Sequence, residues 1–164
     1  MARCLSKPRG AVHLIPGGIK EMLLTSGGKE TKCVLKSRMG FVRLAVNSGA
    51  KLVPVLAFNE KHMHELVGPP EFIRKFLHRM LRIAPILPVG RWGTLLGRTH
   101  RRDTGAPIRL GVVFGEPLAP SPIVDGDAQG AVERTHAAYC AKLLEMHERY
   151  KSLFECDDDT LTFV

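Results

Sequence analysis

The sequence predicts an α/β domain in which a mixed sheet is flanked by helices and the chain closes with a long C-terminal helix. Three observations predict this fold class. Residues 40–48 carry apolar side chains at helical spacing, residues 52–58 form an unbroken apolar run, and residues 132–154 again repeat apolar side chains at helical intervals. With 164 residues, of which 45% are hydrophobic, the chain is long enough to bury a core.

The N-terminal part is expected to end in a glycine turn. Residues 1–10 are polar and expected to fray, and residues 11–15 alternate weakly, as in a strand. Pro16-Gly17-Gly18 follows, where glycines allow either a plain tight turn or a close approach of the backbone to a ligand. Glu21 comes three residues later, where a carboxylate either serves a site or interacts with the first turn of a helix.

A strand–helix–strand unit is predicted next, with strands over 33–35 and 52–58 and a helix over 40–48 that Gly49 terminates. Such a unit normally forms a right-handed crossover between parallel strands. The expected buried stripe of the helix is Phe41, Leu44, Ala45 and Ser48.

Basic side chains gather at the entrance of this unit, at Lys36, Arg38 and Arg43. They are either a solvated basic edge or a positive site for a phosphate or a polarised carbonyl oxygen.

Residues 70–83 predict a basic amphipathic helix that starts at Pro69-Pro70 and stops before Pro85. Its apolar half is Phe72, Ile73, Phe76, Leu77, Met80, Leu81 and Ile83, and its basic half is Arg74, Lys75, His78, Arg79 and Arg82. Such a helix packs its apolar half on the sheet with its cations toward water, or lies in a membrane interface with its cations at the lipid phosphates. Packing on the core and a basic face turned toward a membrane are also compatible with each other.

The C-terminal part contains a strand over 108–114, a linker over 119–130 and the long helix. One face of that helix is predicted to hold Val132, His136, Tyr139, Leu143, Met146, Tyr150 and Phe154. His136 is expected to be a hydrogen-bonded histidine at the edge of the core. The domain is expected to end near residue 155 and to leave 156–164 as a loose tail.

Composition limits the class of partner. The net charge of +8 favours nucleic acid or an anionic membrane surface, unless the excess cations only face water. A basic strand with interleaved aromatic residues is absent, which argues against nucleic acid.

The four cysteines lack CxxC spacing and are expected to be reduced thiols on a cytosol-facing protein. His62 and His64 lack a third ligand, so an exposed loop rather than a metal site is predicted.

Three segments, in this order, resemble motifs of the type 2 diacylglycerol acyltransferase family, within the glycerolipid acyltransferase superfamily. Pro16-Gly17-Gly18-x-x-Glu21 resembles its Pro-Gly-Gly-x-x-Glu element. Residues 38–60 resemble its Arg-x-Gly-Phe-x-Lys/Arg block with the following Val-Pro and Phe-Gly-Glu/Gln, although Asn59 replaces the family's glycine. Gly115-Glu-Pro-Leu118 resembles its Val-Gly-x-Pro-Ile element. The resemblance covers about residues 10–155 and the C-terminal half of the family, so the fold expected is part of an acyltransferase-like mixed sheet.

The resemblance implies an acyl-CoA-dependent O-acyltransferase of neutral lipid (triacylglycerol) synthesis, which transfers a fatty acyl group to a diacylglycerol-like hydroxyl. It implies acyl-CoA as co-substrate without a further cofactor, a glycerolipid acceptor, oligomers as in the family, and the cytosolic face of the endoplasmic reticulum membrane or a lipid droplet. The substrate-binding residues that it implies are Pro16, Gly17, Gly18, Glu21, Arg38, Gly40, Phe41, Arg43, Pro54 and Glu60. The membrane-contacting residues expected are Phe72, Arg74, Lys75, Phe76, Arg79, Arg82 and Trp92.

The catalytic base of this family is not among these residues. Acyl transfer to a hydroxyl needs a general base, which the family carries in an upstream His-Pro-His-Gly block and the superfamily in His-x4-Asp. Neither pattern occurs at any of the seven histidines. The chain is therefore expected to be a fragment of an enzyme, inactive by itself. The alternative is a catalytically silent peripheral membrane module that uses the helix over 70–83.

Overall fold

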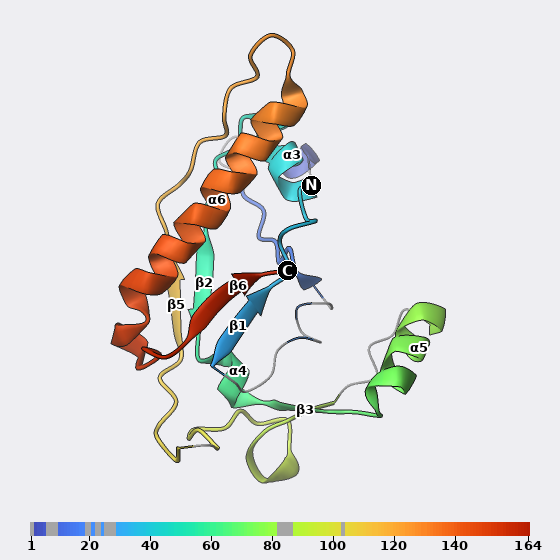
Figure 1. Ribbon diagram of the computed structural model, residues 1–164, viewed down its shortest axis with the longest axis vertical. Coiled ribbons are helices and arrows are strands. Elements are labelled where there is room, and N and C mark those ends of the chain that lie inside the picture. The colour runs from blue at the N-terminus through green and yellow to red at the C-terminus, as the bar shows by residue number, and fades with distance from the viewer. Residues whose placement is uncertain are drawn as a thin grey trace.

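The computed structural model describes residues 2–5, 10–18, 21, 24, 29–81, 87–102 and 104–164. It is a mixed α/β structure with small sheets and a long C-terminal helix, which confirms the predicted fold class (Figure 1). The elements are α1 (Ala2–Leu5), β1 (Glu30–Cys33), α3 (Gly40–Ser48), β2 (Val55–Phe58), α4 (Glu60–Met63), β3 (Glu65–Val67), α5 (Glu71–Leu81), β4 (Leu87–Val89), η1 (Arg91–Gly93), β5 (Gly111–Phe114), α6 (Ala128–Tyr150), η2 (Ser152–Phe154) and β6 (Thr160–Phe163).

The core forms along one face of α6, which runs beside β2 and α3 (Figure 1). Asp127 caps this helix by accepting the backbone N–H of Gly130 at 2.8 Å. The buried side chains of α6 are Ala131, Val132, Thr135, His136, Tyr139, Leu143, Met146 and His147. This face contains the predicted residues from Val132 to Met146 and adds Ala131, Thr135 and His147, whereas the helix ends at Tyr150, before Phe154.

Helix α3 has the predicted bounds. Gly49 ends it in the left-handed conformation, with φ 67°, and donates its N–H to the carbonyl of Ala45. The buried face is Val42, Ala45 and Val46, so the expected stripe was shifted by about one residue. The reason is that α3 packs against the first turns of α6, where Ala131 and Val132 leave room for the β-branched side chains.

The described strands form three separate pairs. β1 pairs with β6 in parallel, and β2–β5 and β3–β4 are antiparallel. The predicted parallel crossover between the two strands that flank α3 was therefore wrong, because β1 and β2 each pair with a strand from the C-terminal half. The strand expected over 33–35 lies at 30–33, and residues 11–15 form no strand.

The last residues are not a loose tail. Glu30↔Thr160 to Cys33↔Phe163 is a continuous parallel register, with Leu161 buried against the core. The acidic run before it concealed this strand, because charged residues suggest solvent unless each carboxylate has a partner. Asp159 has such partners in Lys61 and Thr31.

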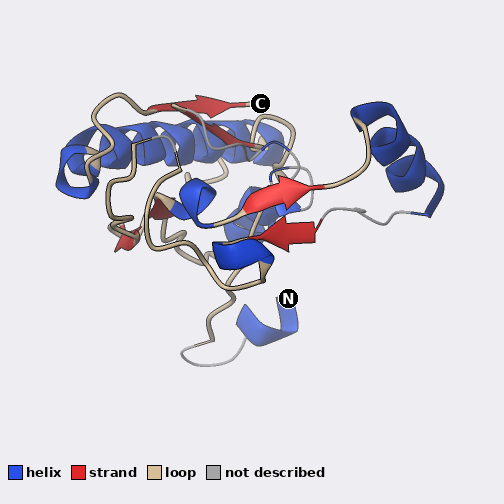
Figure 2. Cartoon of the chain, turned by 90° about the horizontal axis from the view of Figure 1, so that it is seen from below, coloured by secondary structure: helices blue, strands red, loops and turns tan. Residues whose placement is uncertain are grey.

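Helix α5 stands away from the body of the molecule (Figures 1 and 2). Phe72, Phe76 and Met80 are 60–72% exposed. These three side chains therefore do not pack on the sheet, which was one of the two expectations for this helix. Ile83 and Arg82 lie outside the described residues. No helix in the described ranges is both long and apolar enough to cross a bilayer.

Candidate functional site

The Pro-Gly-Gly turn is closed by the side chain of Glu21. A Cβ on the buried Gly17 would collide with the Glu21 carboxylate and Cβ, so only glycine fits there. Gly18 adopts φ 57°, which also favours glycine. Glu21 Oε2 accepts the backbone N–H of Val34 at 2.9 Å. The carboxylate thus ties the turn to the residue that follows β1.

The chain after β1 is held from the other side by α6. The Leu35 carbonyl lies 3.0 Å from His136 Nε2, and because a carbonyl only accepts, Nε2 donates the hydrogen bond. His136 is therefore hydrogen-bonded at the core edge, as predicted. The ring of Tyr139 packs edge-on against Phe41, with 5.2 Å between centroids. These contacts fix the entrance to α3 beside the glycine turn.

The cysteine thiols and the tyrosine hydroxyl of this region are held neutral. Burial, with a smaller contribution from the charge of Glu21, raises the pKa of Cys33 to about 12. Burial also raises the pKa of Tyr139 to about 12 and the pKa of Cys140 above its usual value. The two thiols therefore remain protonated at neutral pH and do not supply a thiolate nucleophile.

The other predicted substrate-binding residues divide into two groups. Arg38, Gly40 and Arg43 are exposed around the start of α3, where Arg38 N–H donates to the Leu35 carbonyl at 2.9 Å. Pro54 is instead fully buried against Gly115 and Met146. Glu60 is exposed at the start of α4, at the opposite end of β2 from α3 (Figure 1). The structure thus brings the turn close to the entrance of α3 and places Pro54 and Glu60 elsewhere.

Asn59 shows why the family has glycine at this position. Its φ is 64°, in the left-handed region that asparagine tolerates better than most residues with a side chain. Its Nδ2 donates to the carbonyls of Arg109 at 2.9 Å and Phe154 at 2.8 Å, and its Oδ1 accepts from Cys156 Sγ at 3.1 Å. The asparagine side chain thereby links the end of β2 to the segment before β5 and to η2, and glycine has no side chain to form these hydrogen bonds.

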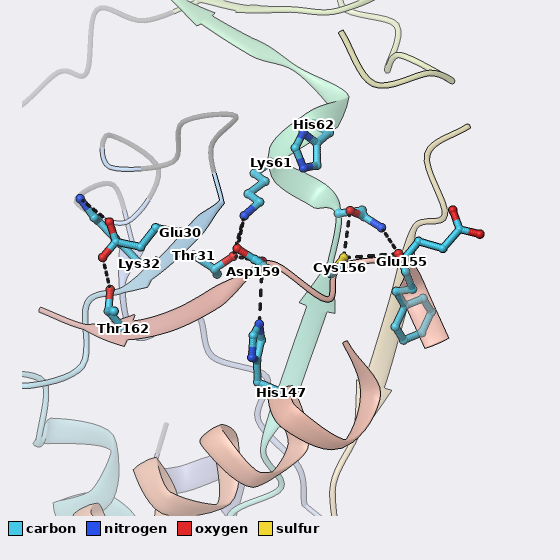
Figure 3. A network of polar contacts seen from close by, with 12 residues as sticks. Glu30, Thr31, Lys32, Lys61, His62, His147, Glu155, Cys156, Asp159 and Thr162 are labelled. Atoms are coloured by element: carbon cyan, nitrogen blue, oxygen red, sulfur yellow. Dashed lines mark hydrogen bonds and ion pairs between the residues drawn. The ribbon is translucent and has the colours of Figure 1, made fainter. Parts of the chain in front are cut away.

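A buried polar network joins α4, β1, α6 and the segment before β6 (Figure 3). Asp159 Oδ1 lies 2.5 Å from Lys61 Nζ, and Asp159 Oδ2 accepts from Thr31 Oγ1 at 2.8 Å. His147 Nε2 is 3.8 Å from the same Oδ2. Burial by itself would raise the pKa of Asp159, but the contacts with His147, Lys61 and Thr31 outweigh it and lower the pKa to about 2. Sequence reasoning missed this network, because neither Lys61 nor Asp159 stands in a pattern that predicts burial.

The prediction that His62 and His64 lie in an exposed loop was wrong. His62 is buried on α4, with its Nε2 2.7 Å from Arg101 Nη2. His64 Nε2 lies 3.0 Å from the Leu95 carbonyl. Among the residues that the structure describes, no group of three histidine, cysteine or carboxylate side chains could hold a metal ion.

A hollow of about 500 Å³ lies between Gly90 and Arg102, beside η1. Arg91, Arg98, His100 and Arg102 line it, and Glu65 accepts hydrogen bonds from Arg98 and Arg102. These hydrogen bonds, first that from Arg98, and the positive charge of Arg102 lower the pKa of Glu65. We call this feature the basic hollow. Trp92, predicted to contact membrane, stands 78% exposed at its edge.

The fold and these contacts define a mixed α/β protein with a carboxylate-closed glycine turn and a separate basic hollow. Over residues 2–164 the chain matches the family model described as diacylglycerol acyltransferase. The chain therefore belongs to the diacylglycerol acyltransferase family.

Curated relatives agree with this assignment. Acyl-CoA wax alcohol acyltransferase 2 of Homo sapiens is 30% identical over 87% of this chain and 43% of its own length. Diacylglycerol O-acyltransferase 1 of Schizosaccharomyces pombe is 33% identical over 90% of this chain and 43% of its own. Diacylglycerol O-acyltransferase 2 of Danio rerio is 31% identical over 92% and 42%. The chain thus spans less than half the length of these relatives. No solved structure matches it.

Proposed function

We propose that this chain is the acceptor-binding part of an acyl-CoA-dependent O-acyltransferase of neutral lipid synthesis, which esterifies the hydroxyl of a diacylglycerol-like lipid. The observation that carries the proposal is the tie from Glu21 to Val34, which fixes the glycine turn beside α3 in a chain that matches the family over residues 2–164. The relatives named above include diacylglycerol and wax alcohol acyltransferases, and the proposal takes the diacylglycerol-like acceptor.

In this proposal the turn and the start of α3 contact the acceptor. Glu21 orients the turn through Gly17, and the exposed backbone of Gly18 approaches the glycerol portion. Arg38 and Arg43, which are exposed, supply positive charge for a polarised carbonyl oxygen. We assign His136 a structural role, because it is buried on α6 and its Nε2 donates to the Leu35 carbonyl. The resemblance assigns proton removal to a His-Pro-His-Gly segment, which in a complete enzyme would face this turn.

A chimera tests the proposal. Residues 2–164 replace the matching portion of the zebrafish relative, and triacylglycerol formation from acyl-CoA and diacylglycerol is measured in membranes. We expect turnover in the chimera and none in the isolated chain. Glu21→Gln should lower turnover roughly tenfold or more, because it weakens a charge-assisted hydrogen bond that positions the turn. Lys51→Gln, at an exposed position outside the proposed site, is the matched control.

Two results would contradict the proposal. One is a chimera that reaches the membrane and keeps its helical content but forms no triacylglycerol. The other is a Glu21→Gln chimera with the turnover of the Lys51→Gln control.

The exposed side of α5 favours a second candidate, a peripheral membrane module located at the cytosolic face of the endoplasmic reticulum or on a lipid droplet. Phe72, Phe76 and Met80 stand out from the body together with the exposed Arg79, and Arg74 and Lys75 lie on the same helix. Flotation with anionic liposomes tests it. Phe72→Ser with Phe76→Ser should abolish binding, whereas Leu153→Ser, at an equally exposed site on η2, should not. Equal flotation of both variants would exclude α5 as the contact.

A further inference from the structure

The loop beside the basic hollow has a fixed shape. The N–H of Gly90 donates to the Thr94 carbonyl at 2.6 Å, and the N–H of Arg91 donates to the Leu96 carbonyl at 2.7 Å. A Cβ on Gly90 would collide with the backbone of Leu96, so the two sides of the loop touch. The loop is also anchored outside itself, because the N–H of Arg98 donates to the Met63 carbonyl at 2.9 Å.

This loop holds Trp92 in an unfavourable conformation. Its φ is 53°, in the left-handed region, which costs a bulky residue about 1–2 kcal/mol. The ring nevertheless stays 78% exposed, with the Arg91 guanidinium 4.0 Å from its centroid. Backbone strain that is retained around an exposed aromatic side chain is typical of ligand contacts.

The charges of the hollow favour an anion. Arg91, Arg98 and Arg102 line it together with His100, and among the described residues Glu65 is the carboxylate that accepts hydrogen bonds from Arg98 and Arg102. Glu65 holds the Arg98 and Arg102 guanidinium groups close to each other and leaves further N–H donors on both. A planar guanidinium donates two parallel hydrogen bonds to phosphate oxygens, which is why arginine clusters suit phosphate.

Apolar side chains stand next to this charge. Trp92, Leu95 and Leu96 are 63–78% exposed in the same loop. The chain that leads into the loop carries the exposed Leu87 on β4, and α5 with its exposed aromatic residues precedes it. A free inorganic anion needs only the arginines, whereas a phospholipid presents a phosphate with acyl chains directly behind it.

We propose that the basic hollow binds the phosphate of an anionic phospholipid, with Trp92, Leu95 and Leu96 against its acyl chains. This site is separate from the glycine turn. It rests on the proposed function only in taking a membrane lipid as the source of the phosphate.

Trp92 is the only tryptophan of the chain, so its fluorescence reports occupancy directly. The 164-residue chain is titrated with dihexanoyl phosphatidic acid below its micelle concentration, so that no bilayer is present. Separate titrations use inorganic phosphate, coenzyme A and dihexanoyl glycerol. We expect a saturable change with the phosphatidic acid and at least roughly tenfold weaker binding of the other three.

Arg91→Gln with Arg102→Gln should remove this response. Arg109→Gln with Arg134→Gln is the matched control, because it removes the same charge from exposed, ion-paired arginines outside the hollow. Circular dichroism confirms that each variant keeps the helical content of the parent.

Four results would overturn the proposal. Equal affinity for inorganic phosphate or coenzyme A would assign the hollow to a soluble phosphate compound. Equal affinity for dihexanoyl glycerol, which has no phosphate, would show that binding depends only on apolar contacts and not on the arginines. No response to phosphatidic acid, or a response retained in Arg91→Gln with Arg102→Gln, would exclude the hollow as a lipid site. The fluorescence titration does not depend on acyl transfer. If the lipid-site proposal fails, the function proposed for the glycine turn is therefore unaffected.

Discussion

Lys61 and Asp159 form an ion pair across 98 positions of sequence, with side chains only 8% and 11% exposed. The pair joins α4 to the start of β6, and Thr31 brings β1 into the same contact. A buried pair of this kind is stable only as a unit, because removal of one partner leaves a charge without compensation.

Lys61→Met should lower the free energy of unfolding by about 3–5 kcal/mol, because Asp159 then stays buried without its cation. Lys29→Met is the matched control. It breaks the Lys29–Asp158 pair, whose side chains are 79% and 77% exposed, and should change stability far less than Lys61→Met, because water screens the two charges. Denaturant titration measures both. Similar losses in the two variants would show that the Lys61–Asp159 pair contributes no more than a surface pair.

Stability should fall in acid between about pH 4 and pH 2 through Asp159. Its folded pKa, about 2, lies below the ordinary value of 3.8, so the folded state binds this proton less readily than the unfolded chain. The contribution is therefore complete above the ordinary pKa and is lost as pH falls through the folded pKa. Unfolding at several pH values should show a shallower slope in this window for Asp159→Asn. An unchanged slope would assign the acid dependence to other carboxylates.

Gly17→Ala should destabilise the glycine turn by about 1–3 kcal/mol, because the new methyl group displaces Glu21 and breaks its hydrogen bond to Val34. Gly40→Ala is the control, since its Cβ would meet no neighbouring atom and its φ is not in the left-handed region. Glu21→Ala in the Gly17→Ala background should cost less than it does alone. Additive losses would show that the two residues are not coupled.

Asn59→Ala should cost more stability than Asn59→Gly. Both variants lose the hydrogen bonds to the Arg109 and Phe154 carbonyls, but only alanine also carries the cost of the left-handed conformation, about 1 kcal/mol. Thermal unfolding of the three proteins checks the order. Equal melting temperatures for the alanine and glycine variants would mean that the backbone relaxes at this position.

Local patterns predicted the helices well. Gly49 after an apolar stripe gave the end of α3, and the separation of apolar and basic residues between Pro70 and Pro85 gave α5. Strand pairing was not predictable, because the partner of β1 is chosen by packing against α6 and by the Asp159 contacts rather than by neighbouring sequence.

The proximity of the proposed site residues was predicted in part, whereas their roles remain predictions. The motif spacing placed Gly17 and Glu21 together, and the structure adds Val34 as the partner of the carboxylate. Pro54 and Glu60 are near in sequence to the helix entrance, but β2 carries Glu60 to its far end and α6 covers Pro54. The basic hollow depends on Glu65 and on the closed loop after Gly90, and no periodicity reveals such a contact.

The pairing of Glu30 with Thr160 has a consequence for biosynthesis. While the polypeptide is being translated, β1 has an unpaired edge until residues 160–163 emerge from the ribosome. The edge of β1 that receives β6 therefore stays unpaired while the intervening residues are made, and an unpaired strand edge is a template for pairing with another chain.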